Sequence, residues 1–467
     1  MITETGNLGL LCEWLDAEGQ EAVRTRLDAV RLGQLSHGLG ALSGAAPDSL
    51  QPSGRKVVER FAAELSRWSV TDAATFERLA RHWAPAYILH QILYGQNIER
   101  EDRELLAATL DGISLAEHLR GDGSEATYAI LTDDSCRILC PTQDAWIQFA
   151  RKEWVGHHVL CRTDAAQAGI SATSGGSEKV QAPLAWPPAT SLARLIPFPR
   201  AAGWDIPVIE GGRPLGICFD ETEKDRPDLP PLTDTLRDAY TLIFEVWPEV
   251  VPWARMLVPA FVDAGTTAPG IRRSGTRGAV SPIFLSRVPG PLMHAEDVVH
   301  ELQHIRFHLL VDPADFSSYA DADPSYVSPV RTDPRPLWGL HLALHAFVAV
   351  NELRLRLRHA GAVPTEQVSA QLFKSHCDNL MTFQTILDFD DLAPAGRVYF
   401  AEVARALSRQ HDLIEPGVPA EYRQRVDDRL ERHCQRVLRA NSRAKNASSR
   451  YRQWPEIVTR ARDFSPT

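Results

Sequence analysis

The residues best suited to chemistry lie between His294 and His308, in the sequence H-A-E-D-V-V-H-E-L-Q-H-I-R-F-H. His300, Glu301 and His304 form an H-E-x-x-H motif inside it. Residues four apart lie on one face of an α-helix, so two imidazoles with this spacing can ligate a single metal ion. The glutamate beside the first histidine can then lie near metal-bound water. The motif predicts a metal site; the simpler alternative is an amphipathic helix with histidines on its polar stripe.

The segment that carries the motif also has an apolar side. Its apolar residues recur at helical spacing: Val298, Val299, Leu302, Ile305, Leu309 and Leu310. A helix with this pattern packs on a hydrophobic core. We therefore expect a buried helix with an inward-facing site.

A second group of metal-ligating side chains follows at Trp338 to Arg358, which also reads as a helix. His341, His345 and Glu352 fall at i, i+4 and i+11 in it, hence on one face. Each could supply a third metal ligand from a helix that faces the first. Histidines on a helix are more often not ligands, but two helices that present them to a common interface favour a metal site.

Between the two helices, Tyr326 to Leu337 reads Y-V-S-P-V-R-T-D-P-R-P-L. Its three prolines restrict the backbone to extended and turning conformations. Arg331 and Arg335 therefore lie on a stiff segment, and a rigidly held arginine suits a bidentate contact with a carboxylate. The structural alternative is that these arginines pair with Asp323 or Asp333 within the protein.

The order of these motifs resembles a known family. It runs from G-A-V-S-P-I-F-L-S through V-V-H-E-L-Q-H to Y-V-S-P-V-R-T-D-P-R-P-L-W-G and the histidine-containing helix. This order, which spans about Gly278 to Arg358, resembles the H-E-x-x-H-type peptide β-hydroxylases that depend on α-ketoglutarate. Members of that family are encoded with ribosomally made peptide natural products. The resemblance implies an Fe(II)/α-ketoglutarate-dependent dioxygenase that uses O2 and hydroxylates a β-carbon of a precursor peptide.

The resemblance also implies roles for particular residues. His300 and His304 would ligate Fe(II), and mononuclear iron oxygenases usually add a third ligand, often a carboxylate. His345 and Glu352 are favoured for that position over His341. Arg335, and after it Arg331, would bind the distal carboxylate of α-ketoglutarate. Glu301 would orient a ligand or a water molecule.

Two other functions fit the same motif. A zinc metallopeptidase would use His300 and His304 as ligands, Glu352 as the third ligand and Glu301 as the general base. The arginine-proline segment favours the hydroxylase, because a peptidase needs no rigid partner for a carboxylate. A non-catalytic peptide-binding module is the remaining alternative, and the presence of both motif histidines argues against it.

Composition limits the partners and the compartment. The chain has 467 residues and a formal net charge of −10, which argues against non-specific binding to nucleic acid. We expect no membrane partner, because no apolar run reaches the length of a transmembrane helix. The seven cysteines are scattered and odd in number, so a disulfide framework is not expected. Together with the lack of a leader pattern at the N-terminus, this predicts a cytoplasmic protein.

The predicted fold class is α+β and predominantly helical, with the H-E-x-x-H helix beside a small sheet and helical parts at both ends of the chain. Four regions are expected: an N-terminal helical region at 1–125, a mixed α/β region at 126–262, the metal-site core at 263–362 and a C-terminal helical region at 363–467. The first boundary marks a change from helical spacing to short β-like runs such as A-T-Y-A-I-L-T.

Overall fold

The computed structural model describes most of the chain and all of the H-E-x-x-H segment. The described residues are 17–44, 52–94, 98, 100–120, 126–131, 137–149, 158–164, 169–174, 177–183, 193–210, 215, 229–266, 273–311, 326–330, 334–363, 365–389, 392–414, 420–440 and 454–464. Within these residues the predicted class is confirmed, because the fold is predominantly helical with small sheets. None of the helices described is both long and apolar enough to cross a membrane.

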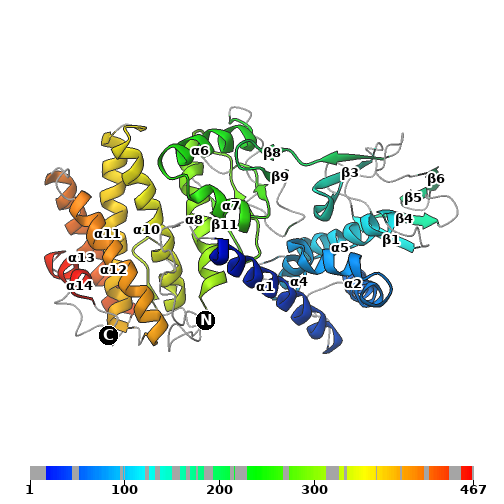
Figure 1. Cartoon of the computed structure of the whole chain (residues 1–467), viewed down its shortest axis with the longest axis horizontal. Coiled ribbons are helices and arrows are strands. Elements are labelled where there is room, and N and C mark those ends of the chain that lie inside the picture. The colour runs from blue at the N-terminus through cyan, green and yellow to red at the C-terminus, as the bar shows by residue number, and fades with distance from the viewer. Residues whose placement is uncertain are drawn as a thin grey trace. The chain divides into compact units, whose positions relative to one another are not determined.

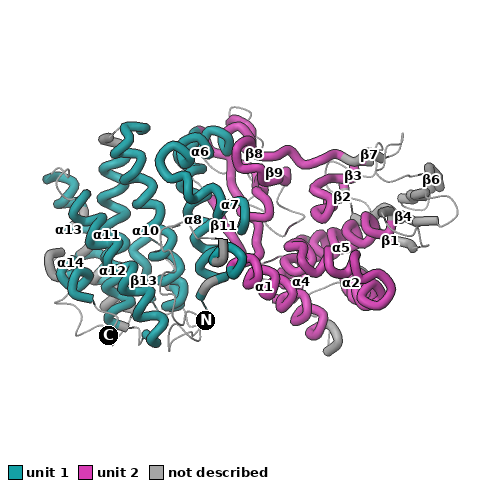
Figure 2. The backbone as a smooth tube through the Cα atoms, viewed as in Figure 1, with its two compact units in different colours: residues 1–22, 235–257, 290–467 teal, residues 23–234, 258–289 magenta. Residues whose placement is uncertain are grey.

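The chain forms two compact units whose segments interleave along the sequence (Figure 2). Unit 1 comprises Met1–Ala22, Thr235–Leu257 and Gly290–Thr467, and unit 2 comprises Val23–Asp234 and Val258–Pro289. Each unit therefore combines parts of several of the four regions expected along the sequence. The H-E-x-x-H helix belongs to unit 1.

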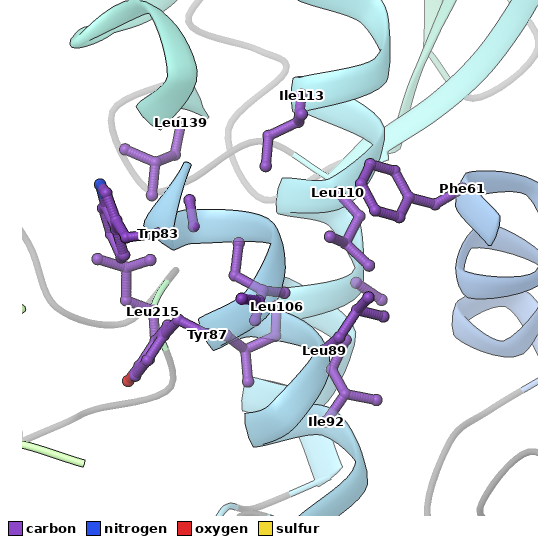
Figure 3. Close-up of a cluster of buried hydrophobic side chains, with 14 of the residues drawn as sticks. Phe61, Trp83, Tyr87, Leu89, Ile92, Leu106, Leu110, Ile113, Leu139 and Leu215 are labelled. Carbon is purple, nitrogen blue, oxygen red and sulfur yellow. The ribbon is translucent and has the colours of Figure 1, made fainter. Parts of the chain in front are cut away.

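Unit 2 begins with five helices, which agrees with the helical spacing of the N-terminal region. They are α1 (Ala17–Gly44), most of which lies in this unit, α2 (Pro52–Thr71), α3 (Ala73–Arg81), α4 (Trp83–Tyr94) and α5 (Arg100–Arg120). Asp72 caps α3, and its side chain accepts a hydrogen bond from the Thr75 backbone N–H at 3.1 Å. Figure 3 shows the core of this unit, where the buried face of α4 meets α5 around Tyr87, Leu89 and Leu110.

The sheets of unit 2 account for the β-like texture that follows the helices. Its strands are β1 (Ala126–Leu131), β2 (Arg137–Cys140), β3 (Ala145–Phe149), β4 (His158–Asp164), β5 (Gly169–Ser174), β6 (Ser177–Pro183), β7 (Ala193–Pro197), β8 (Arg200–Ala201), β9 (Ile206–Glu210), β10 (Phe261–Asp263), β11 (Ser274–Gly275) and β12 (Ile283–Leu285). They form sheets in the orders β1-β4-β5-β6, β2-β3-β7 and β11-β12-β10-β9-β8. The short helix η1 (Pro141–Gln143) joins β2 to β3.

The last of these sheets directly precedes the H-E-x-x-H helix in the sequence. Its centre is parallel, since Phe261 of β10 is in register with Val208 of β9 on one side and with Ile283 of β12 on the other. The three central strands are apolar and buried apart from Asp263 and Glu210 at the ends of β10 and β9, as expected of parallel strands. This sheet belongs to unit 2, whereas the helix that follows β12 belongs to unit 1.

Unit 1 is built from helices (Figure 1). They are α6 (Leu232–Val246), which begins at the unit boundary, α7 (Val250–Leu257), α8 (Pro291–Leu310), α10 (Leu337–His359), α11 (Thr365–Phe389), α12 (Pro394–Ile414), α13 (Ala420–Ala440) and α14 (Trp454–Asp463). A two-stranded ribbon of β13 (Tyr326–Val327) and β14 (Pro334–Arg335) precedes α10. α10 packs against α8, α11 and α12, so it lies at the centre of the unit.

α8 begins and ends with clear local signals. Gly290 has an extended conformation at the N-cap, and Pro291 occupies the first helical position, where a missing N–H has no cost. The helix ends before Val311, which is extended and whose N–H donates to the carbonyl of Phe307 at 2.9 Å. Val298, Val299, Leu302, Ile305 and Leu309 are buried, which confirms that the predicted apolar side faces a core.

Candidate metal centre

The H-E-x-x-H residues come together on α8 as the spacing predicts. His300, Glu301 and His304 each offer one donor atom, and these three atoms lie within 4.8 Å of one another. Among the described residues this is the one group of three or more His, Cys, Asp or Glu side chains that could hold a metal ion. His300 and His304 are partly exposed, whereas Glu301 is only 2% exposed. The two imidazoles can therefore receive a ligand from outside, while the carboxylate is held on the interior side.

The distance between the two imidazoles fits a shared ion. The Nε2 atoms of His300 and His304 are 3.0 Å apart, and the ring planes are nearly perpendicular at 84°. Two nitrogens on bonds of about 2.1 Å are separated by this distance when they subtend about 90° at the metal. A tetrahedral angle would separate them by about 3.4 Å with the same bonds. The separation also suits a direct imidazole–imidazole hydrogen bond, in which one ring donates and the other accepts.

α8 is held against α10 on both sides of His300. One turn before it, Glu296 forms a bidentate ion pair with Arg354 of α10, with contacts of 2.7 and 2.9 Å. Both side chains are at most 10% exposed. The ring of His300 itself lies edge-on to Phe347 of α10, with centroids 4.7 Å apart. The face of α10 that meets the metal group therefore includes Phe347 and Arg354.

His345 joins three helices through hydrogen bonds from both ring nitrogens. Its Nε2 lies 2.8 Å from Oε1 of Gln303 on α8, and its Nδ1 lies 2.8 Å from the Tyr399 hydroxyl on α12. Arg306 also donates to that Gln303 oxygen at 2.7 Å. An oxygen that accepts from Arg306 can accept from His345 too, so Nε2 carries the proton and Nδ1 accepts from Tyr399. In this arrangement neither nitrogen of His345 is available to a metal.

The charge state of this network follows from its burial. Burial lowers the pKa of His345 well below 6.5, and the positive charge of Arg306 lowers it further. Burial raises the pKa of Tyr399 well above 10. Both groups are therefore neutral near pH 7, which matches a hydroxyl that donates to an imidazole nitrogen. Arg306 is only 1% exposed, and its guanidinium lies 4.3 Å from the centre of the Trp253 ring on α7. This cation–π contact stabilises the buried positive charge.

The other residues predicted as third ligands also lie away from the group. Glu352 is 3% exposed and forms ion pairs with Arg356 at 3.0 Å and with Arg409 of α12 at 2.6 Å. The ring of His341 lies near Phe400 of α12, with centroids 5.9 Å apart. The residues of the predicted face contact α12 through Phe400, Tyr399 and Arg409, and His345 also contacts Gln303 of α8.

The two predicted carboxylate-binding arginines differ in what the structure describes. Arg331 lies outside the described residues. Arg335 is partly exposed at the end of β14, directly before α10. Three residues later, Trp338 contacts Phe307, with ring centroids 4.7 Å apart, and Phe307 lies just beyond His304 on α8. Arg335 is thus positioned at the end of α10 that packs on the C-terminal turns of α8.

The ribbon that contains Arg335 is anchored from outside by α13. Arg429 donates to the Pro329 carbonyl at 2.8 Å and also pairs with Asp378 of α11. Arg436 donates to the Ser328 carbonyl at 3.2 Å. The basic α13 helix thus supports this segment with part of its charge.

Several residues around the group were not recognised from the sequence. Glu296, Gln303 and Tyr399 form the contacts that fix α8 relative to α10 and α12. Glu296 and Gln303 could have been noticed as polar residues on the helix that carries the motif. Their partners could not be predicted, because these lie 42 to 58 residues away in the chain. No protein-family model and no curated protein matches the chain.

Proposed function

We propose that the chain is an Fe(II)- and α-ketoglutarate-dependent oxygenase that hydroxylates a β-carbon of a ribosomally made peptide. The observation that carries the proposal is the donor set on α8, two imidazoles and one carboxylate within 4.8 Å of one another. This set is typical of non-haem Fe(II) oxygenases, which leave the remaining positions of the metal open. The 3.0 Å separation of the imidazole nitrogens also suits the angle of an octahedral site.

His300 and His304 would hold the metal, and Glu301 would complete the set. When bound, Fe(II) and α-ketoglutarate supply the oxidation that replaces a C–H bond by C–OH. The protein holds the imidazoles in position through the contacts of α8 with α10, on either side of His300. Arg335 would pair with the distal carboxylate of α-ketoglutarate, because a guanidinium binds a carboxylate in a bidentate manner.

The test is a reaction of the anaerobically loaded Fe(II) protein with α-ketoglutarate, O2 and the peptide encoded beside its gene. We expect the peptide to gain one oxygen atom and α-ketoglutarate to yield succinate, both measured by mass spectrometry. His304→Ala should abolish both products. Cleavage of the peptide without α-ketoglutarate would refute the proposal and support a zinc peptidase with Glu301 as general base.

Glu301→Gln tests by metal binding alone whether Glu301 is a metal ligand. If Glu301 is a ligand, the amide should bind the metal at least about 10-fold more weakly, since a neutral amide is a poorer donor than a carboxylate. If Glu301 is only a general base, metal affinity should be retained while hydrolysis is lost.

Binding of α-ketoglutarate can be followed by thermal unfolding of the metal-loaded protein. A ligand at 100 times its dissociation constant stabilises the folded state by about 2.7 kcal/mol. Arg335→Ala should remove most of this stabilisation. Arg405→Ala is the matched control, because Arg405 is an exposed arginine of α12 that pairs with Glu402. An unchanged shift in Arg335→Ala would exclude Arg335 as the carboxylate-binding residue.

A further inference from the structure

Asn351 of α10 is a buried polar residue that the protein leaves unsatisfied. Its side chain is fully buried, and neither Oδ1 nor Nδ2 has a hydrogen-bond partner among the described residues. Burial of an amide without partners lowers stability, because its hydrogen bonds to water are lost and not replaced. Such a group in a protein interior indicates a partner outside the chain, either a water molecule or a bound ligand.

The position of Asn351 places it at the metal group. Phe347, Asn351 and Arg354 fall at i, i+4 and i+7 in α10, hence on one face of the helix. The first contacts the ring of His300, and the last pairs with Glu296, one turn from His300 on α8. Asn351 therefore lies between the two contacts that α10 makes around the metal-binding histidine.

The chemistry of the unpaired atoms selects the ligand. Nδ2 needs an acceptor and Oδ1 needs a donor, and both needs arise at the same side chain. A carboxylate, such as either end of α-ketoglutarate, only accepts hydrogen bonds and would leave Oδ1 unsatisfied. A peptide unit presents one N–H and one carbonyl together, so it satisfies both atoms.

We infer that Asn351 binds a backbone amide of the peptide substrate next to the metal group. The inference rests on the proposed function in so far as a peptide is the substrate. Asn351 is then a specificity residue that holds the main chain, and so sets which side chain lies at the metal. Its lack of a partner among the described residues is a stability cost that the bound peptide removes.

The experiment compares Asn351→Leu with the natural chain in two measurements. Calorimetric titration of the anaerobic Fe(II) protein, without O2, gives its affinity for the peptide encoded beside its gene and for α-ketoglutarate. We expect peptide affinity to fall by about 10-fold or more, because two hydrogen bonds are lost, while α-ketoglutarate affinity stays within about 3-fold. Thermal unfolding of the metal-free chain should show a rise of about 2 °C or more, since an unpaired amide has been replaced by an apolar group of similar size.

Asn379→Leu provides the matched control. Asn379 is also buried, on α11, and its Nδ2 has no partner among the described residues, but α11 packs on α10, α12, α13 and α14. This variant should leave peptide affinity unchanged. Asn351→Ala, which leaves room for water, should weaken peptide binding as Asn351→Leu does.

The inference is overturned if both Asn351 variants bind the peptide as the natural chain does, or if the natural chain binds no peptide. A fall in melting temperature with unchanged affinity would assign Asn351 a structural role. Because no turnover is measured, a failure of hydroxylation in the reaction above would refute the oxygenase proposal without altering these affinities.

Discussion

Replacement of His345 by leucine should lower stability and leave metal binding almost unchanged. The imidazole makes two buried hydrogen bonds of 2.8 Å, with Gln303 and with Tyr399. Each contributes about 1 kcal/mol, and the Tyr399 hydroxyl left without its acceptor costs about 1–3 kcal/mol. Leucine fits the buried position by size and adds no further cost, so we expect the free energy of unfolding to fall by about 3–5 kcal/mol.

The effect on metal affinity follows from the position of the ring. Removal of a group that hydrogen-bonds directly to a metal ligand typically lowers metal affinity about 10- to 100-fold, which corresponds to about 1–3 kcal/mol. The partners of His345 are Gln303 and Tyr399, neither of which belongs to the donor group. We therefore expect a change of less than about 10-fold in His345→Leu, whereas His304→Leu should lose more than about 100-fold.

The assay combines urea unfolding of the metal-free chain with competition for Fe(II) or Zn(II) against a chelator of known affinity. Tyr399→Phe is the matched control, since it removes one of the two hydrogen bonds and keeps the ring; it should cost about 1 kcal/mol with no change in metal affinity. Loss of metal binding in His345→Leu as complete as in His304→Leu would refute the reasoning. It would show that the imidazole leaves Gln303 and ligates the ion.

Three further predictions follow from buried groups of unit 1. Glu296→Leu or Arg354→Met alone should lower the free energy of unfolding by about 3–5 kcal/mol, because one buried charge loses its partner. The double variant should cost clearly less than the sum of the two, as measured by a double-mutant cycle in urea. Burial lowers the pKa of His376 from 6.5 to about 3, so the unfolded chain binds the proton first as pH falls below 6.5. The free energy of unfolding should then fall by about 1.4 kcal/mol per pH unit. His376→Leu should reduce this slope between about pH 6 and 4, and an unchanged slope would contradict the assignment. Removal of the metal by a chelator should lower the melting temperature of the natural chain, in line with a stabilisation of about 4 kcal/mol at 1,000 times the dissociation constant, and should leave that of His304→Ala unchanged.

Local signals in the sequence were sufficient for much of the fold. The Ser/Gly/Pro stretch after residue 43 matches the end of α1 at Gly44 and the start of α2 at Pro52. The largely apolar run from Met256 to Asp263 is divided between two elements, because its first part ends α7 at Leu257 and only Phe261–Asp263 pair as β10. A continuous apolar run can end a buried helix or form a buried strand, so periodicity alone could not place that boundary.

The division into units could not be read from the sequence. Unit 1 takes in Thr235–Leu257 and then the chain from Gly290 onward, while the strands β10 to β12 between them belong to unit 2. Shifts in composition mark changes along the chain, whereas a compact unit is defined by contacts between segments that are far apart in the sequence. Strand pairing such as that of Phe261 with Val208 joins segments more than 50 residues apart, and no local signal encodes it.

The sequence by itself determined the geometry within α8, because the four-residue spacing of His300 and His304 places both imidazoles on one face of any helix that contains them. Only the tertiary structure decided which face of α10 meets that group. Every residue from Val348 to Leu355 is buried, so the apolar periodicity that would reveal an inward face is absent from this stretch. Helical spacing states which residues share a face, but packing decides what that face contacts. Glu352 pairs with Arg409 of α12, and His345 bonds to both Gln303 of α8 and Tyr399 of α12. Phe347 and Arg354 contact α8, and Asn351 shares their face.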